Sequence, residues 1–325
     1  MKKIITIIFL LVFSLMSIHA QVGYNRSQLD TTLRACLFAH MTEADYGRLY
    51  YSVSLDGFHW KIVNSGKRVK EDYRGHPDIT RGRDGRFYLI GNDEERTKIK
   101  VWVSTDLIDW KELVAFVPNM SVLPEFFPVR VGGAPKIFFD GAGDQFVISW
   151  HTTSAEKGAY NGNFSWRNMR TLFITTKDFK TFSDPKRLFQ FDLPTIDVSI
   201  RKDGDLYYAI LKDEAFVAPD HPTGKTIRIS WSKSLNGPWS EPTDKIMPNW
   251  CEAPTAIVNP DGSGWLIYAE RYSAVRYELV QAPTLQGPFT SPIASSYTMA
   301  PKLKHGGMIN ITKAEYDAIV KKFGF

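Results

Sequence analysis

The chain has 325 residues, with 40 lysines and arginines against 35 aspartates and glutamates, and it contains two cysteines. The net charge is +5, but the lysines and arginines form no dense basic block, which argues against a nucleic-acid-binding protein. No Cys/His spacing typical of zinc is present, and two cysteines cannot form a disulfide scaffold. Cys36 and Cys251 could pair in an oxidising compartment, but the favoured interpretation is that both are small buried apolar side chains.

Residues 1–20 have the composition of a secretory signal peptide. Lys2 and Lys3 precede an apolar run from Ile4 to Met16, and Ala20 stands before the predicted cleavage point. The run is too short for a comfortable membrane span. We therefore expect a periplasmic or secreted protein without a membrane span, whose mature part is residues 21–325.

The first predicted strands are Ala35–Met41 and Arg48–Ser54, and a turn follows them. In this turn Ser, Asp and Trp have a spacing that returns further along, as Ser54, Asp56, Trp60 and then Ser104, Asp106, Trp110. Asp can bond its own turn backbone, and Trp can pack between sheets. Weaker versions occur at Lys177–Phe182, Ser234–Trp239 and Thr284–Phe289, so the sequence contains five such outer turns.

A second motif repeats between these turns: a strand with a polar or Pro entrance, a Gly-containing turn, and an apolar strand. It occurs at Gly75–Gly91, Ala134–Trp150, Ile196–Leu211 and Glu252–Ala269. Repeats of this size indicate a propeller or a similar array. Four inner strands against five outer turns leave one inner strand missing, and Met308–Ile311 is the simplest candidate because it would close the ring.

The sequence thus predicts one all-β domain, a five-bladed β-propeller closed by a C-terminal strand. A short helix should follow from Thr312, since Thr312 and Glu315 have capping-box spacing. The alternative is a six-bladed, sialidase-like propeller, in which three arginines (Arg130, Arg170 and Arg271) and a Tyr nucleophile would have to converge.

Polar residues stand at the entrances of the predicted inner strands, which line the central pocket of a propeller. They are His76, Asp78, Asp197 and Glu252. One such Asp alone is usually a turn group. Three carboxylates at equivalent places in a repeat suit glycoside hydrolysis, with one base, one acid and one group that orients the acid.

Four motifs resemble glycoside hydrolase family 43, in particular its arabinosidase and xylosidase group. They are Arg130-Val131-Gly132-Gly133-Ala134-Pro135, Thr195-Ile196-Asp197-Val198-Ser199-Ile200, Glu252-Ala253-Pro254 and Lys304-His305-Gly306-Gly307. The resemblance implies a five-bladed propeller in which Glu252 is the general acid and Asp197 orients it. It places His305 in the channel near a bound water or cation, which would be a structural calcium, and it implies no required cofactor.

The sequence departs from this family at the base. The relatives read Arg-Asp-Pro-His-Ile where this chain reads Gly75-His76-Pro77-Asp78-Ile79, so Asp and His have exchanged places. Both still point to one face of a strand. Asp78 could be the base with the reaction centre shifted, His76 could be the base or a substrate ligand, or the site could be inactive.

The pocket should also contain residues that bind sugar, because aromatic faces pack on sugar rings and Arg reads hydroxyl or carboxylate groups. The candidates are His76, Arg130, Trp150, His151, Trp250, Arg271 and His305. Each Trp could equally pack between blades. The insertion Ser154–Met169 could form the wall of a subsite or be a surface loop.

We therefore predict a secreted glycoside hydrolase that acts on arabinofuranoside or xyloside bonds of polysaccharide fragments, with inversion as the family resemblance implies. Its catalytic residues would be Asp78, Asp197 and Glu252. The alternative is a carbohydrate-binding pseudoenzyme that has the fold but an altered base.

Overall fold

The structure is a computed structural model, and it describes residues 32–126, 133–154, 166–219 and 221–325. The predicted signal peptide (residues 1–20), Arg130 and most of the insertion at 154–169 lie outside this part of the chain. Among the described residues, no helix combines the length and the apolar character that a membrane crossing needs.

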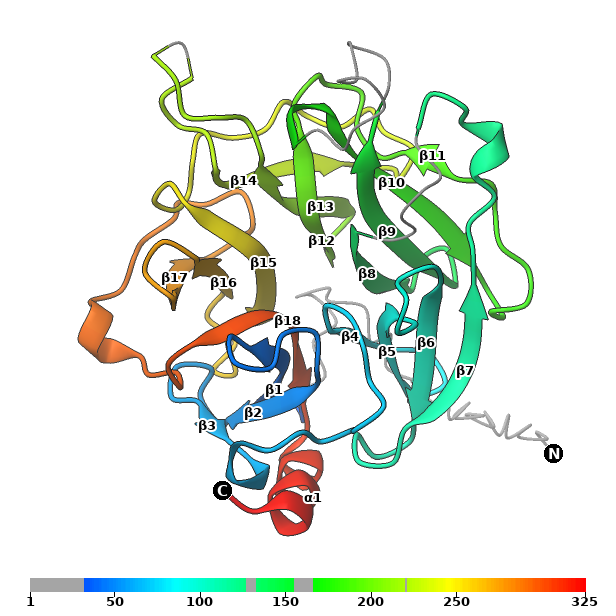
Figure 1. The fold of residues 1–325 in the computed structure, drawn as a ribbon. Coiled ribbons are helices and arrows are strands. Elements are labelled where there is room, and N and C mark those ends of the chain that lie inside the picture. The colour runs from blue at the N-terminus through cyan, green and yellow to red at the C-terminus, as the bar shows by residue number, and fades with distance from the viewer. Residues whose placement is uncertain (1–31, 127–132, 155–165, 220) are drawn as a thin grey trace, which may run out of the picture.

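Five antiparallel sheets surround a common centre, as Figure 1 shows from one end of the ring. Blade 1 consists of β18 (Leu303–Ile311), β1 (Ala35–Thr42), β2 (Tyr50–Ser54) and β3 (Lys61–Ile62). Blade 2 consists of β4 (Asp78–Arg81), β5 (Phe87–Asn92), β6 (Ile99–Ser104) and β7 (Lys111–Phe116). Blade 3 consists of β8 (Gly133–Asp140), β9 (Gln145–Thr153), β10 (Met169–Thr176) and β11 (Lys186–Arg187). Blade 4 has β12 (Thr195–Asp203), β13 (Leu206–Asp213) and β14 (Thr226–Ser232), and blade 5 has β15 (Cys251–Val258), β16 (Trp265–Arg271) and β17 (Arg276–Ala282). The five-bladed prediction is confirmed, and the six-bladed alternative is wrong.

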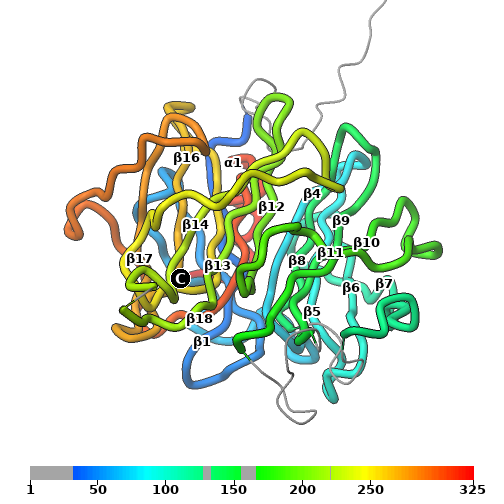
Figure 2. Tube along the Cα trace, turned by 90° about the horizontal axis from the view of Figure 1, so that it is seen from above, coloured from blue at the N-terminus to red at the C-terminus, as the bar shows by residue number. Residues whose placement is uncertain are grey.

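The two ends of the described chain meet in blade 1, as predicted. Strand β18 pairs with β1 from Ala35 opposite Ile311 to Thr42 opposite Leu303, and the two strands lie side by side in both Figure 1 and Figure 2. Helix α1 (Lys313–Phe323) follows, and Thr312 and Glu315 form the predicted capping box. Glu315 also accepts two hydrogen bonds from Arg81 of blade 2, at 2.8 and 2.7 Å, so the helix cap fastens blade 1 to blade 2.

The hydrophobic core is divided among the contacts between blades. The described residues contain five buried apolar clusters, one at each junction of neighbouring blades. In β16, Trp265 and Ile267 face blade 4, whereas Leu266 and Tyr268 face blade 1. Both faces of such a strand are buried, which explains why it reads as a continuous apolar run instead of an alternating one. Cys36 and Cys251 are free and lie buried in two of these clusters, as favoured from the sequence.

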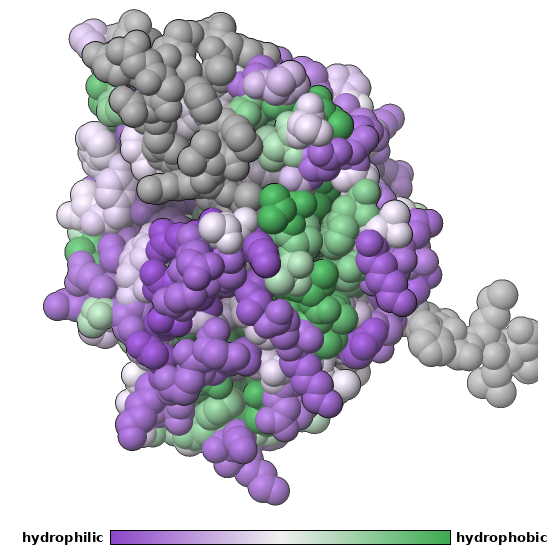
Figure 3. Space-filling view, turned by 45° about the vertical axis from the view of Figure 1, so that its right-hand side comes forward, coloured by the Kyte–Doolittle hydropathy of each residue, from purple (hydrophilic) through white to green (hydrophobic). Residues whose placement is uncertain are grey.

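The outer turns and edges also follow from local sequence. Oδ1 of Asp56 accepts hydrogen bonds from the backbone N–H groups of Phe58 and His59, as predicted for this turn, and Asp106 does the same for the two residues at its turn. The outermost strands β3, β7 and β11 each begin with Lys, which discourages pairing with another chain. Figure 3 shows one face of the molecule, on which apolar patches are bordered by hydrophilic residues.

Gly307 permits the close approach of blades 1 and 2. A Cβ atom at this position would lie 2.0 Å from Oδ1 of Asp78, which is 2% exposed. We expect Gly307→Ala to destabilise the protein by about 2 kcal/mol, because a buried carboxylate would have to move. Urea unfolding measures this change, and an unchanged midpoint would show that Asp78 is free to shift.

Candidate active site

A backbone irregularity recurs where the inner strands of blades 3, 4 and 5 begin. The pairing register breaks at Gly133/Lys136 in β8, at Ile196/Ser199 in β12 and at Glu252/Thr255 in β15. At each break one non-glycine residue has a left-handed backbone: Ala134 (φ 42°), Asp197 (φ 52°) and Ala253 (φ 49°). Such conformations are costly and gather at functional sites. The bulges re-aim the side chains at the entrances of these strands.

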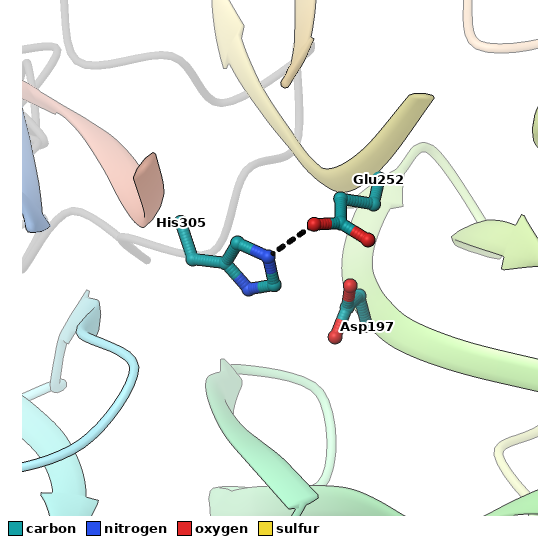
Figure 4. A group of neighbouring side chains, drawn as sticks. All are labelled: Asp197, Glu252 and His305. Atoms are coloured by element: carbon teal, nitrogen blue, oxygen red, sulfur yellow. Dashed lines mark hydrogen bonds and ion pairs between the residues drawn. The ribbon is translucent and has the colours of Figure 1, made fainter. Parts of the chain in front are cut away.

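Asp197, Glu252 and His305 come together at these entrances, from β12, β15 and β18 (Figure 4). Nε2 of His305 lies 2.9 Å from Oε1 of Glu252. Oδ2 of Asp197 accepts a hydrogen bond of 3.1 Å from the backbone N–H of Ala253, directly after Glu252. Asp197 therefore holds the bulge that presents Glu252, and its contact is with the backbone rather than with the Glu252 carboxylate.

Glu252 is the centre of a chain of alternating charges. The groups in order are Lys225, Glu214, Lys212, Glu252, His305, Glu270 and Lys304. Lys212 lies 2.9 Å from Glu214 and 2.7 Å from Glu252, while Glu270 lies 2.7 Å from Lys304. Of the two carboxylates paired with Lys212, Glu252 is the more exposed: 20% of its side chain is accessible, against 4% for Glu214. This row of alternating charges therefore holds in place a carboxylate, Glu252, that remains accessible.

The protonation of the site follows from these contacts. Burial alone would raise the pKa of Glu252, but the nearby His305 and Lys212 hold it well below its usual range. Burial would lower the pKa of His305, yet Asp197, Glu252 and Glu270 together raise it. Burial raises the pKa of Glu270. Both shifts favour a Glu252 carboxylate beside a protonated His305.

The exchanged pair His76 and Asp78 lies in two different surroundings. The ring of His76 is 4.7 Å from the ring of His305, so it borders the cluster. The Asp78 carboxylate accepts a hydrogen bond of 2.9 Å from the N–H of Ile137 in blade 3, and it abuts Gly307 of blade 1. Asp78 therefore joins three blades through these contacts, and its assignment as the base stays a prediction.

The predicted sugar-binding residues also separate into two groups. His151 and Trp250 lie near the cluster: Nδ1 of His151 is 3.8 Å from Oδ1 of Asp197, and Trp250 is 42% exposed two residues before Glu252. Trp150 is 3% exposed and packs in the core between blades 2 and 3, so it is not available to a sugar. Arg271 is paired with Glu278 at 3.3 Å, on the side of β16 opposite to Glu270.

Sequence reasoning missed Tyr46, Lys212, Glu214 and Glu270. Lys212 and Glu214 stand at the end of the buried strand β13, and Glu270 stands near the end of β16. A charge that ends a fully apolar strand beside a predicted channel is a signal that could have revealed them. Tyr46 lies on the loop between β1 and β2, and nothing in the repeat marks it.

The residues near His305, where the family resemblance implies a calcium ion, offer few oxygen ligands. Asp197, Glu252 and His305 each offer one atom within 4.8 Å of the others. Calcium takes six to eight oxygen ligands. Here one donor is an imidazole already bonded to Glu252, and Lys212 lies 2.7 Å from the other Glu252 oxygen. These residues in this arrangement do not fit calcium, and they need no metal for the proton transfers that they can perform.

A five-bladed propeller with two carboxylates and an imidazole converging at the entrances of its inner strands is the arrangement that the sequence predicts for a glycoside hydrolase. The chain belongs to the family of probable glycosyl hydrolase domains related to glycosyl hydrolase family 43, whose model matches residues 32–317. The family resemblance of the sequence motifs is thereby confirmed.

Individual relatives are more distant. An α-L-arabinofuranosidase from Bifidobacterium longum subsp. longum is 28% identical over 225 residues, which is 60% of this chain and 21% of that protein. The chain thus spans about a fifth of the length of this curated relative. An exo-β-1,3-galactanase from Clostridium thermocellum has a similar fold, with a TM-score of 0.56, 13% identity, and coverage of 84% of this chain and 62% of that one. A family 43 enzyme engineered for endo-xylanase and exo-arabinofuranosidase activity gives a TM-score of 0.52 at 11% identity, covering 85% and 54%.

Proposed function

We propose that the protein hydrolyses arabinofuranoside or xyloside bonds in polysaccharide fragments, with inversion at the anomeric carbon. The observation that carries this proposal is the position of Glu252, an accessible carboxylate held between His305 and Lys212 and presented by a bulge that Asp197 fastens. The α-L-arabinofuranosidase relative supports the choice of sugar.

Glu252 donates a proton to the leaving oxygen. In the resting site that proton lies on His305, 2.9 Å away, and the two groups titrate as a pair. When the glycosidic oxygen approaches Glu252, the proton passes from His305 to the Glu252 carboxylate. From there it passes to the leaving oxygen. A general acid of this kind contributes about 10²- to 10⁴-fold to the rate.

Trp250 and Tyr272 provide a surface on which a sugar ring can pack. Their rings meet edge to face at 6.2 Å, and Trp250 is 42% exposed. Lys212 lies 4.8 Å from the centre of the Tyr272 ring, so this surface adjoins the same lysine that binds Glu252. A sugar packed here has its glycosidic oxygen near the proton donor.

The test is a panel of aryl α-L-arabinofuranosides, β-xylosides and β-galactosides, with the anomer of the first product followed by NMR. We expect release from an arabinofuranoside or xyloside and an inverted first product. A retained product would refute inversion. Sugar binding without turnover on the whole panel would refute hydrolysis and favour the pseudoenzyme.

We further propose that the protein is exported and that residues 1–20 are removed. The support is the basic start and short apolar run of this segment. N-terminal sequencing of the protein from its native cells should begin at Gln21, and a chain that begins at Met1 would overturn this proposal.

A further inference from the structure

We propose that His76 is the base that takes the proton from the attacking water. Tyr46 is the positioning residue that fixes the tautomer of His76. This inference rests on the proposed function and names the group that the exchanged Asp78 leaves unassigned.

Backbone contacts hold Tyr46 and His76 together. The loop that carries Tyr46 joins the strand entrance of His76 through the N–H of Gly75, which donates to the carbonyl of Gly47 at 3.0 Å. Nη1 of Arg74 donates to the carbonyl of Tyr46 itself at 2.9 Å. The loop is fixed from the other side by an ion pair between Asp45 and Arg68. Tyr46 is therefore placed by the neighbours of His76 in sequence.

A side-chain hydrogen bond of 2.8 Å connects the hydroxyl of Tyr46 to Nε2 of His76, with the two rings perpendicular. We assign the ring hydrogen to Nε2, which donates to the Tyr46 oxygen. Nδ1 then has its lone pair open, and within the described part of the chain it has no hydrogen-bond partner. A histidine whose tautomer is fixed in this way can accept a proton at one defined atom.

The surroundings keep both groups in the required form. Burial and the nearby His305, Lys136 and His151 lower the pKa of His76 well below its usual value, so the ring is neutral in the resting site. Tyr46 is 44% exposed, and its partial burial together with the carboxylates of Asp197 and Glu252 raises the pKa of Tyr46, so its hydroxyl stays protonated.

The separation from the proton donor suits an inverting reaction. His305 lies between the two groups, with its ring 4.7 Å from that of His76 and its Nε2 2.9 Å from Glu252. The centre of the His76 ring is therefore at most about 9 Å from Glu252, which does not exceed the upper limit of the spacing of about 6.5 to 9.5 Å at which inverting pairs admit a water. Asp78, by contrast, accepts a hydrogen bond from the Ile137 N–H, lies against Gly307 and is 2% exposed.

The reaction balances with these two groups. Water attacks the anomeric carbon, its proton passes to Nδ1 of His76, the glycosidic carbon–oxygen bond breaks, and Glu252 protonates the leaving oxygen. His76 then releases its proton to solvent, and the Glu252–His305 pair regains one.

The experiment compares His76→Ala, His76→Gln and Tyr46→Phe with wild type on an aryl glycoside that wild type cleaves, with and without azide. We expect kcat of both His76 variants to fall at least about 100-fold, since a general base is lost. Azide needs no base, so it should restore turnover in His76→Ala and yield an inverted glycosyl azide. Tyr46→Phe keeps the ring and should lower kcat about tenfold with little change in KM, with a shifted acidic limb of the kcat/KM profile.

Tyr50→Phe is the matched control, since Tyr50 bonds Asp45 at the same loop, and its kcat should stay at the wild-type value. If both folded His76 variants hydrolyse at the wild-type rate while Glu252→Gln is inactive, this inference is overturned and the proposed function stands. Azide rescue of Asp78→Asn instead of His76→Ala would return the base to Asp78. A wild type without turnover overturns both proposals.

Discussion

Glu252→Gln should abolish measurable hydrolysis of substrates with poor leaving groups and leave the fold intact. The amide cannot deliver a proton, so we expect kcat to fall about 10³-fold on an unactivated disaccharide and less on an aryl glycoside with a good leaving group. Stability should change little, because Lys212 retains Glu214 and His305 retains Glu270 as ionic partners. Steady-state kinetics on both substrates and a thermal unfolding scan measure these effects.

Glu278→Gln is the matched control for this change. Glu278 lies in the same blade, on β17, and binds Arg271 and Arg276 away from the cluster. Its kcat should equal that of wild type. An equal loss of activity in both variants, or equal loss on both substrates in Glu252→Gln, would contradict the role of Glu252 as proton donor.

Lys212→Met should have the largest effect on stability and should also change the pH profile. Lys212 is 4% exposed, and its ammonium neutralises two carboxylates, Glu214 and Glu252. Removing one partner from a buried charge network costs about 3 kcal/mol, which urea unfolding detects. Lys212 helps to hold the pKa of Glu252 low, so its loss should raise that pKa. A general acid works while protonated, and the alkaline limb of kcat/KM should therefore move to higher pH.

Lys313→Met provides the comparison. Lys313 pairs with Asp317 on the surface of α1, where both side chains are more than half exposed, and such pairs contribute less than about 1 kcal/mol. Lys212→Arg should recover part of the stability and move the alkaline limb back toward wild type. If Lys212→Met unfolds at the wild-type urea concentration, the charge chain is not a structural element.

Much of the fold could be predicted because the sequence repeats it. Apolar second strands such as β5 and β16 are buried on both faces, and the local turn chemistry of Asp56 and Asp106 marks the outer turns of the first two blades. Ring closure followed from counting inner strands against outer turns, and the structure confirms it in the pairing of β18 with β1.

The site was harder to predict, because His76 lies in the bend before β4, whereas Asp78 is the first residue of that strand. A backbone N–H from blade 3 engages Asp78, and no pattern within blade 2 records that neighbour. Trp150 was predicted to bind sugar, but it packs against the neighbouring blade. An aromatic residue near a channel looks the same in sequence whether it faces the channel or the next blade. Asp197, Glu252 and His305 could be found because their short motifs recur in a known family.

The pairing of β18 with β1 also has a consequence for biosynthesis. The two strands join residues more than 260 positions apart, so this contact has a very high sequence separation and must form late. While the chain emerges from the ribosome, blade 1 lacks its inner strand and His305 is still to be made. A nascent chain therefore has an open ring. Under the proposed chemistry it is also inactive until β18 has been translated.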